Sequence, residues 1–359
     1  MGILEEPEDV HVQKAHRVNG LAGTPFSLGF RLPAEWERHE GTWLAWPKNP
    51  DTFTKGHLVA VRKAYASMID ELCTGERVHL LVDDNQSKKE VLALVGPKRN
   101  LTFHTIKSSD VWIRDYGPIF VRDSGVAATK WVFNAWGDKY DDLLPDDRTG
   151  DLVAKETGLS RFETGRVLEG GSIDVNGRGV MLTTRQCLLN KNRNPNLNTE
   201  EIEAMLRENL GAENIVWLER GIEGDDTDGH VDDIARFVAH DTIVCMMDES
   251  GPNRESLAAN LELVRGARDP SGRPFRVEEL PMPARIEGDG GTLPASYANF
   301  YIGNSVVLVP TFNDSNDGKA MKLLGRLFPS RRVVGVDCRS LVTGLGAIHC
   351  VTQQQPASV

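Results

Sequence analysis

Four polar segments of the sequence combine a thiol, an imidazole and several carboxylates, which are the groups that enzymes use for nucleophilic and acid–base catalysis. They are Ser109–Pro118, Leu168–Ser172, Asp225–Asp233 and Gly344–Cys350, and each opens or follows an apolar run that is typical of a strand. Functional side chains are commonly displayed from such places on a rigid scaffold. We therefore treat these four segments as candidate parts of one site.

Cys350 and His230 are the groups that could carry the chemistry, although each also has a simpler interpretation. Cys350 follows a glycine-rich stretch and precedes a polar tail, whereas most cysteines taken alone are buried and inert. His230 stands two positions before Asp232, so an extended segment would place both side chains on the same face. A histidine in a surface turn is the alternative.

The acidic run Asp225–Asp233 raises the question of a metal. It holds a single histidine among its aspartates, and it lacks the HExxH spacing of a zinc site. We therefore expect a solvated acidic turn there, and we expect neither a metal nor an organic cofactor.

The composition limits the partners of the chain. Its 359 residues include 41 Lys+Arg and 52 Asp+Glu, which gives a formal net charge of −11. This balance argues against binding to nucleic acid, which needs clustered positive charge, and it favours a cationic ligand. No window reaches the roughly 18 apolar residues that cross a bilayer, and the N-terminus lacks the pattern of a signal peptide, so we expect a cytoplasmic protein without membrane contact. The five cysteines are far apart and form no CxxC pair, which argues against a disulfide framework.

Helical patterns followed by β-branched runs recur five times along the chain. The expected pairs are 63–72 with 78–82, 149–157 with 162–168, 202–210 with 215–218, 257–267 with 275–280, and 320–328 with 332–336. Further strands are expected at 242–246 and 306–309. Recurrence of small α/β units indicates a closed ring, with an irregular α/β domain as the alternative. We expect an N-terminal arm over residues 1–30 and a single domain over residues 31–359.

The joint order of several motifs resembles the agmatine deiminase family of the guanidine-modifying superfamily. The resemblance rests on the following segments, which together extend over about nine tenths of the chain: Arg31–Glu37, Thr42–Pro47, Glu169–Ile173, Leu189–Pro195, Asp226–Asp232 and Ile348–Pro356. It implies an α/β fold of five ββαβ blades around an axis that carries the active site, a pentein fold. This number of blades agrees with the five units counted from periodicity.

The resemblance also implies roles for individual residues. Cys350 corresponds to the nucleophile, His230 to the general acid and base, and Glu169 to the acid that hydrogen-bonds the imidazole. Asp115 and Asp232 correspond to the carboxylates that hold a guanidinium group, and Trp112 is a candidate for the pocket wall. Asp110 is the rival of Asp115, and the spacing from the tryptophan favours Asp115.

One segment departs from the family pattern. The family usually has Gly-Gly-Gly-Asn before Ile-His-Cys, whereas this chain has Gly344-Leu345-Gly346-Ala347. This difference concerns the fit of the substrate more than the class of reaction.

The implied activity is hydrolysis of agmatine to N-carbamoylputrescine and ammonia through a thiouronium intermediate on cysteine, a step of putrescine biosynthesis. The small cationic guanidino substrate is then the partner, and a homo-oligomer is left open. Two alternatives remain open: a deiminase of free or peptidyl arginine, and a polyamine-binding module without catalysis.

Overall fold

The computed structural model describes residues 23–358, which form a mixed α/β structure. Five of its sheets share one pattern, in which a middle strand is antiparallel to one neighbour and parallel to the other. The strands of these sheets are β1 (His39–Ala45), β2 (Arg77–Val82), β3 (Leu101–Thr105), β4 (Ile119–Arg122), β5 (Val126–Val132), β6 (Ser160–Val167), β7 (Ile173–Val175), β8 (Val180–Thr184), β9 (Asn214–Leu218), β10 (Ala235–Ala239), β11 (Thr242–Met247), β12 (Arg276–Pro281), β15 (Tyr301–Ile302), β16 (Val306–Thr311), β17 (Arg332–Asp337) and β18 (Gln353–Pro356).

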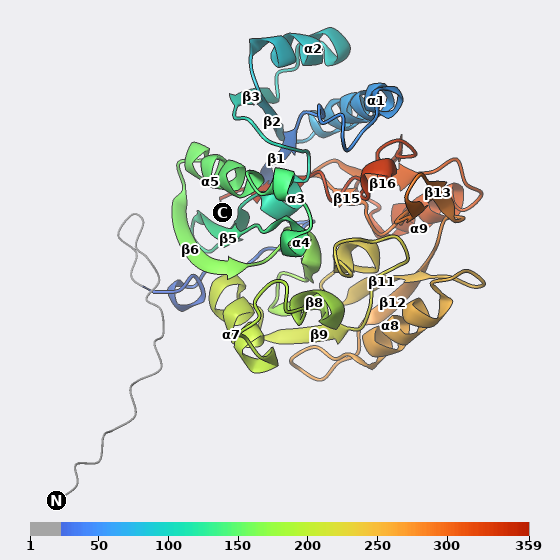
Figure 1. Cartoon of the computed structure of the whole chain (residues 1–359). Helices are drawn as coiled ribbons and strands as arrows, with labels where there is room; N and C mark the ends of the chain where they lie inside the picture. Colours follow the sequence, from blue (N-terminus) through green and yellow to red (C-terminus); the bar gives the residue numbers. More distant parts are fainter. Residues whose placement is uncertain (1–22, 359) are drawn as a thin grey trace, which may run out of the picture.

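A helix connects the two parallel strands of each of these sheets, as a parallel crossover requires. These helices are α1 (Lys55–Leu72), α5 (Asp146–Glu156), α7 (Thr199–Leu210), α8 (Arg254–Gly266) and α9 (Asp317–Leu327). Figure 1 shows them toward the outside of the molecule, while the sheets extend toward its centre. The shorter helices are α3 (Ile113–Tyr116), α4 (Ala135–Asp138) and α6 (Arg185–Leu188), and a separate hairpin is formed by β13 (Ile286–Gly288) and β14 (Gly291–Leu293).

The two ends of the described chain meet in one sheet. Its order is β18–β1–β2–β3, so the last strand of the chain pairs antiparallel with the first, with Trp43 opposite Gln353. The strand β18 begins only three positions after Cys350. This pairing therefore fixes the place of the thiol relative to the rest of the fold.

All five expected helix-then-strand pairs are confirmed, and so are the further strands at 242–246 and 306–309. The helix α1 begins at Lys55 rather than at residue 63. The helix α7 has the capping box that Asn198 and Glu201 predict: Asn198 Oδ1 accepts from Glu201 N at 2.9 Å, and Glu201 Oε2 accepts from Asn198 N at 2.8 Å. The sequence analysis missed α2 (Asn85–Val95), an additional helix between β2 and β3.

The expected N-terminal arm lies partly outside the described residues. Residues 23–30 are described, and they include a 3₁₀ turn, η1 (Phe26–Leu28), that contacts α7. Leu28 and Phe30 pack against a buried hydrophobic cluster that includes Leu206 and Leu210 of α7. The described part of the segment is therefore attached to the domain.

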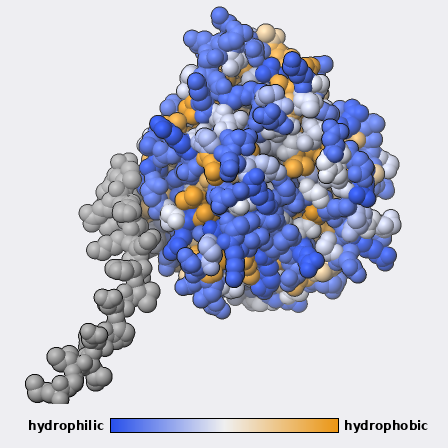
Figure 2. All heavy atoms as spheres, in the orientation of Figure 1, coloured by the Kyte–Doolittle hydropathy of each residue, from blue (hydrophilic) through white to orange (hydrophobic). Residues whose placement is uncertain are grey.

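The surface shown in Figure 2 is mainly hydrophilic, and hydrophobic side chains are scattered over it. Such scattering is normal for a protein surface in contact with water. Among residues 23–358, no helix has both the length and the apolar character that are needed to cross a membrane.

Candidate active site

The four polar segments occupy equivalent places in the fold. Each lies immediately before the edge strand that pairs antiparallel with the middle strand of its sheet. Asp115 lies in α3 before β4, and Glu169 precedes a 3₁₀ turn, η3 (Gly170–Ser172), that leads into β7. His230 precedes η4 (Val231–Asp233), which leads into β10, and Cys350 precedes β18. The repeated architecture therefore brings side chains from distant parts of the sequence to one place.

The glycine at 171 shows how tightly three of these side chains converge. A Cβ atom placed on Gly171 would lie 2.6 Å from His230 Nδ1 and 3.0 Å from both Asp115 Oδ1 and Asp232 Oδ2. Only a residue without a side chain fits at this point. The amide of Gly171 also donates to Asp115 Oδ1 at 2.9 Å, so the same residue positions one of the carboxylates.

The thiol of Cys350 belongs to this group of side chains. Its Sγ lies 3.8 Å from Asp232 Oδ2, and the amide Nδ2 of Asn299 donates to it at 3.1 Å. A Cβ on Gly346 would lie 2.5 Å from Cζ3 of Trp112 and 3.2 Å from Cys350 Sγ. The predicted pocket-wall residue Trp112 therefore lies beside the loop that carries the thiol.

His230 and Asp232 both lie in the site, but the backbone conformation that was expected to bring them together was wrong. The sequence analysis assumed an extended segment, whereas Val231–Asp233 forms a 3₁₀ turn. The turn is stabilised by Asp225, whose Oδ2 accepts from the backbone amides of Gly229 at 2.8 Å and His230 at 3.1 Å. Part of the acidic run thus serves as a local backbone cap rather than as a solvated turn.

Glu169 lies close to the imidazole but does not hydrogen-bond to it in the structure. Its Oε1 accepts from Arg193 Nε at 2.9 Å, while Oε2 has no hydrogen-bond partner among the described residues. Both ring nitrogens of His230 also lack a hydrogen-bond partner within residues 23–358. The nearest charge to Nδ1 is Asp115 Oδ1 at 3.8 Å.

Asp110, the rival of Asp115, faces a different environment. One of its oxygens accepts from the amide of Val111 at 2.8 Å, and the other accepts from the side chains of Asn49 and Thr52. These contacts stabilise the loop. The structure therefore groups Asp115, and not Asp110, with His230 and Asp232.

Burial governs the protonation of these groups. It raises the pKa of Asp115 to about 6, although the nearby charge of His230 opposes this change. Burial also acts to lower the pKa of His230, but the carboxylate of Asp115 and further neighbours outweigh it and raise that pKa well above its usual range. The pKa of Asp232 is lowered, because the hydrogen bond and charge of His349 outweigh the effect of burial.

The thiol experiences the opposite electrostatics from a typical activated cysteine. Burial, and then the negative charges of Asp232, Asp233 and Asp115, raise the pKa of Cys350 well above its usual value. Without a cationic ligand in the site, Cys350 is therefore protonated at neutral pH, although His230 nearby carries a positive charge. A positively charged ligand would favour its ionisation.

Asn299 and His349 are parts of the site that sequence reasoning missed. Asn299 Oδ1 accepts from the amide of His349 at 2.9 Å and from that of Cys350 at 3.3 Å. His349 Nδ1 contacts Asp232 Oδ2 at 2.6 Å. Asn299 stands just before β15, and the predicted site residues stand at the equivalent position before a strand of their own sheets. The repeat itself was therefore the signal that could have identified Asn299.

The departure from the family pattern has a backbone consequence. Leu345 adopts the left-handed conformation, with φ 70° and ψ 27°, at a position where the family usually has glycine. A leucine pays roughly 1 kcal/mol for this conformation, which glycine adopts freely. Ala347, which stands where the family usually has asparagine, is buried.

Comparison with known proteins places this architecture in a family. The family model described as Porphyromonas-type peptidyl-arginine deiminase matches residues 31–356, and the chain belongs to this family. An agmatine deiminase of Stutzerimonas stutzeri is 37% identical, covering 94% of this chain and 98% of that protein.

Solved structures agree with this assignment. The agmatine deiminase of Enterococcus faecalis is similar, with a TM-score of 0.90 and 32% identity, over 96% of this chain and 100% of that one. A cysteine-to-serine variant of the C. jejuni agmatine deiminase with substrate bound has a TM-score of 0.83 and 30% identity, over 98% of this chain and 100% of that one.

Proposed function

We propose that this protein hydrolyses agmatine to N-carbamoylputrescine and ammonia. The observation that carries the proposal is the convergence of a thiol, an imidazole and two carboxylates, namely Cys350, His230, Asp115 and Asp232, around one buried point. The names of the similar proteins support the same activity. The product lies on the way to putrescine, and a cytoplasmic location is part of the proposal.

Asp115 and Asp232 would hold the guanidinium group of the substrate. A guanidinium is planar and carries its N–H donors in a fixed fork, so two carboxylates can hold it by paired hydrogen bonds. Asp232 Oδ1 has no partner within the described part of the chain, which leaves it available for such a bond. Clamping the group would hold its carbon in line with the sulfur of Cys350.

Cys350 would act as the nucleophile and His230 as the acid and base. Attack by Sγ forms a carbon–sulfur bond, and the carbon–nitrogen bond breaks as His230 donates a proton to the departing ammonia. The thiouronium intermediate is then hydrolysed. Water gives one proton to neutral His230 and the water oxygen bonds to the carbon. The carbon–sulfur bond then breaks to regenerate the thiolate, and the remaining hydroxyl proton leaves to solvent as the ureido carbonyl forms. Glu169 would orient the imidazole and balance its charge.

The bound substrate would help to ionise the thiol. Cys350 is protonated in the free site because of burial and the surrounding carboxylates, which keep its pKa well above the usual value. A guanidinium between Asp115 and Asp232 neutralises much of that negative charge and so favours the thiolate, with the thiol proton leaving to solvent. Activation would then occur only when the correct cation is present.

The pairing of the arginines near the centre favours agmatine over arginine as the substrate. An arginine substrate would need a free cationic side chain to bind its carboxylate. Arg114 and Arg236 both lie against Glu35, Arg193 pairs with Glu169, and Arg122 pairs with Glu37. All four are thus already engaged with acidic side chains. Deimination of free or peptidyl arginine remains the second candidate, since the name of the family refers to peptidyl arginine.

The proposal extends to the arrangement of the domain. The five sheets of like pattern, and the site residues that precede the first strand of each, support a pseudo-fivefold ββαβ propeller with the site on its axis. Residues 31–359 would form this single catalytic domain.

Ammonia release from agmatine, free arginine and a peptide arginine tests the substrate and the nucleophile together. The wild type should prefer agmatine, and Cys350→Ala should lose turnover by about 10⁴-fold or more while remaining folded. Cys245→Ala is the matched control, because it removes another buried cysteine, in β11. Retained turnover in Cys350→Ala would refute the nucleophile, and agmatine binding without ammonia release by the wild type would support a non-catalytic module.

A further inference from the structure

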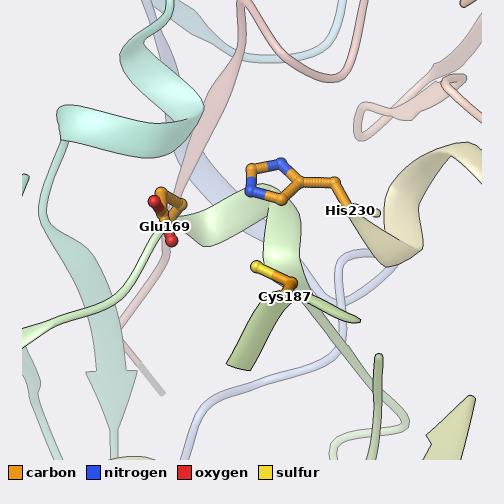
Figure 3. A group of neighbouring side chains, drawn as sticks. All are labelled: Glu169, Cys187 and His230. Carbon is orange, nitrogen blue, oxygen red and sulfur yellow. The ribbon is translucent and has the colours of Figure 1, made fainter. Parts of the chain in front are cut away.

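A second buried thiol lies next to the catalytic imidazole, on the side away from Asp115. Cys187 belongs to the short helix α6, and its side chain is fully buried. One potential ligand atom from each of Glu169, Cys187 and His230 lies within 4.8 Å of the others. Figure 3 shows the Nε2 edge of the imidazole facing Glu169 and Cys187.

Two of these three groups have unused bonding capacity. Within residues 23–358, Glu169 Oε2 and His230 Nε2 have no hydrogen-bond partner, although both side chains are almost completely buried. Unpartnered buried polar atoms are costly and therefore uncommon in folded proteins. Arg193 holds the other oxygen of Glu169 at 2.9 Å, which leaves Oε2 free to face the thiol and the imidazole.

A thiolate, an imidazole and a carboxylate are the ligands that zinc and similar divalent ions prefer. Zinc bonds to nitrogen and oxygen at roughly 2.0–2.2 Å and to sulfur at about 2.3 Å, so ligand atoms around a tetrahedral ion are separated by roughly 3.3–3.8 Å. The three ligand atoms now lie within 4.8 Å of one another, so each pair needs to approach by only about 1 Å. Such a movement is within the reach of side-chain rotation.

We propose that Glu169, Cys187 and His230 form an inhibitory binding site for a zinc-class divalent cation. Binding would form a metal–sulfur bond and a metal–nitrogen bond. It would release to water the thiol proton of Cys187 and one proton of the charged imidazole of His230, so affinity falls as pH falls. The inhibition rests on the proposed function, because the ion would occupy the imidazole and the carboxylate that serve the reaction. Binding of the ion does not rest on the proposed function, because Cys187 has no role in that reaction and Cys350 is not a ligand.

Cobalt(II) binding to the full-length protein, previously treated with a chelator, tests the site directly. A thiolate bound to cobalt gives a charge-transfer absorption in the near ultraviolet. We expect this band in the wild type, in Cys350→Ala and in the control Cys245→Ala, and we expect it to be absent from Cys187→Ala. Competition with zinc should give an affinity that is at least about tenfold weaker for Cys187→Ala than for the wild type.

Cys187→Ser provides a second variant of nearly the same size, should the alanine variant fail to fold. Zinc inhibition of ammonia release, normalised for each variant to its own metal-free rate, should require at least about tenfold more zinc in this variant. A band that disappears in Cys350→Ala but persists in Cys187→Ala would overturn the proposal, as would the absence of a band in the wild type. A wild type that binds cobalt but deiminates no substrate would instead refute the proposed function and leave the metal site standing.

Discussion

Two clusters of buried charge lie next to each other in this protein, and they differ in how that charge is balanced. In the first, which we call the rear cluster, Glu35 lies 2.9 Å from Arg236 and 3.4 Å from Arg114. In the second, the site cluster of Asp115, Asp232, His230, Glu169 and Cys350, several polar atoms have no hydrogen-bond partner among the described residues. The rear cluster has one such atom, Nη2 of Arg236, and it lies against the carboxylate of Glu35.

His349 links the two clusters and makes the difference instructive. Its Nε2 lies 2.8 Å from Glu35 and its Nδ1 lies 2.6 Å from Asp232. Arg236, then His349 and then Arg114 outweigh the burial of Glu35 and lower its pKa. Burial instead raises the pKa of Asp115 to about 6. The rear cluster therefore supplies its own countercharge, while the site cluster leaves room for one from a ligand.

The largest effect is expected from removing charge in the site cluster. Asp115→Asn should lower kcat/KM for agmatine by about 10⁴-fold, because the guanidinium loses a charged partner and its alignment with the thiol. Asp110→Asn is the matched control, since Asp110 is equally buried but bonds to the loop of Asn49 and Thr52. We expect it to cost less than about tenfold. Steady-state kinetics decide between them, and the reverse order would assign the substrate carboxylate to Asp110.

A substitution in the rear cluster should lower the stability of the folded protein. Glu35→Gln leaves two buried arginines without their shared carboxylate, which should lower the free energy of unfolding by roughly 3–5 kcal/mol. The control Glu213→Gln breaks an exposed pair with Arg31 and should cost less than about 1 kcal/mol. Urea denaturation measures both changes. Equal losses in the two variants would contradict the role that we assign to Glu35.

The sequence could predict those parts of the fold that depend on local patterns of residues, but not those that depend on specific contacts. Apolar periodicity predicted the helix–strand pairs, because burying one face of each element is a local property of its residues. It missed α2, whose buried residues are only Val91 and Val95, so its sequence carries a weak helical pattern. The turn at Val231–Asp233 was also missed, since it depends on hydrogen bonds that the carboxylate of Asp225 accepts from nearby backbone amides rather than on periodicity.

The site was predictable to the extent that motifs carry it. The resemblance named Cys350, His230 and Asp115, and the structure brings them together. Asn299 was not identified, although its place before a strand of the repeat could have indicated it. Cys187 was also not identified, because it is recognisable only by what lies beside it in space. Glu35 was equally hidden, because its partners Arg114 and Arg236 are 79 and 201 positions away in the sequence.

The smallest expected effect, a pH dependence of binding, tests the charge balance itself. Asp115 holds a guanidinium only when it is ionised, and its pKa in the free protein is about 6. Agmatine binding to Cys350→Ala should therefore weaken by up to about tenfold for each pH unit below about 6 and should level off above about 7. Asp232 does not contribute to this change, because its pKa is lowered and it stays ionised throughout. Calorimetry between pH 5 and pH 8 measures the affinity, and the double variant Cys350→Ala/Asp115→Asn should bind weakly with a flat profile. An equally steep profile in the double variant would show that another group titrates, and the unbalanced charge at Asp115 would no longer explain how the site selects a cation.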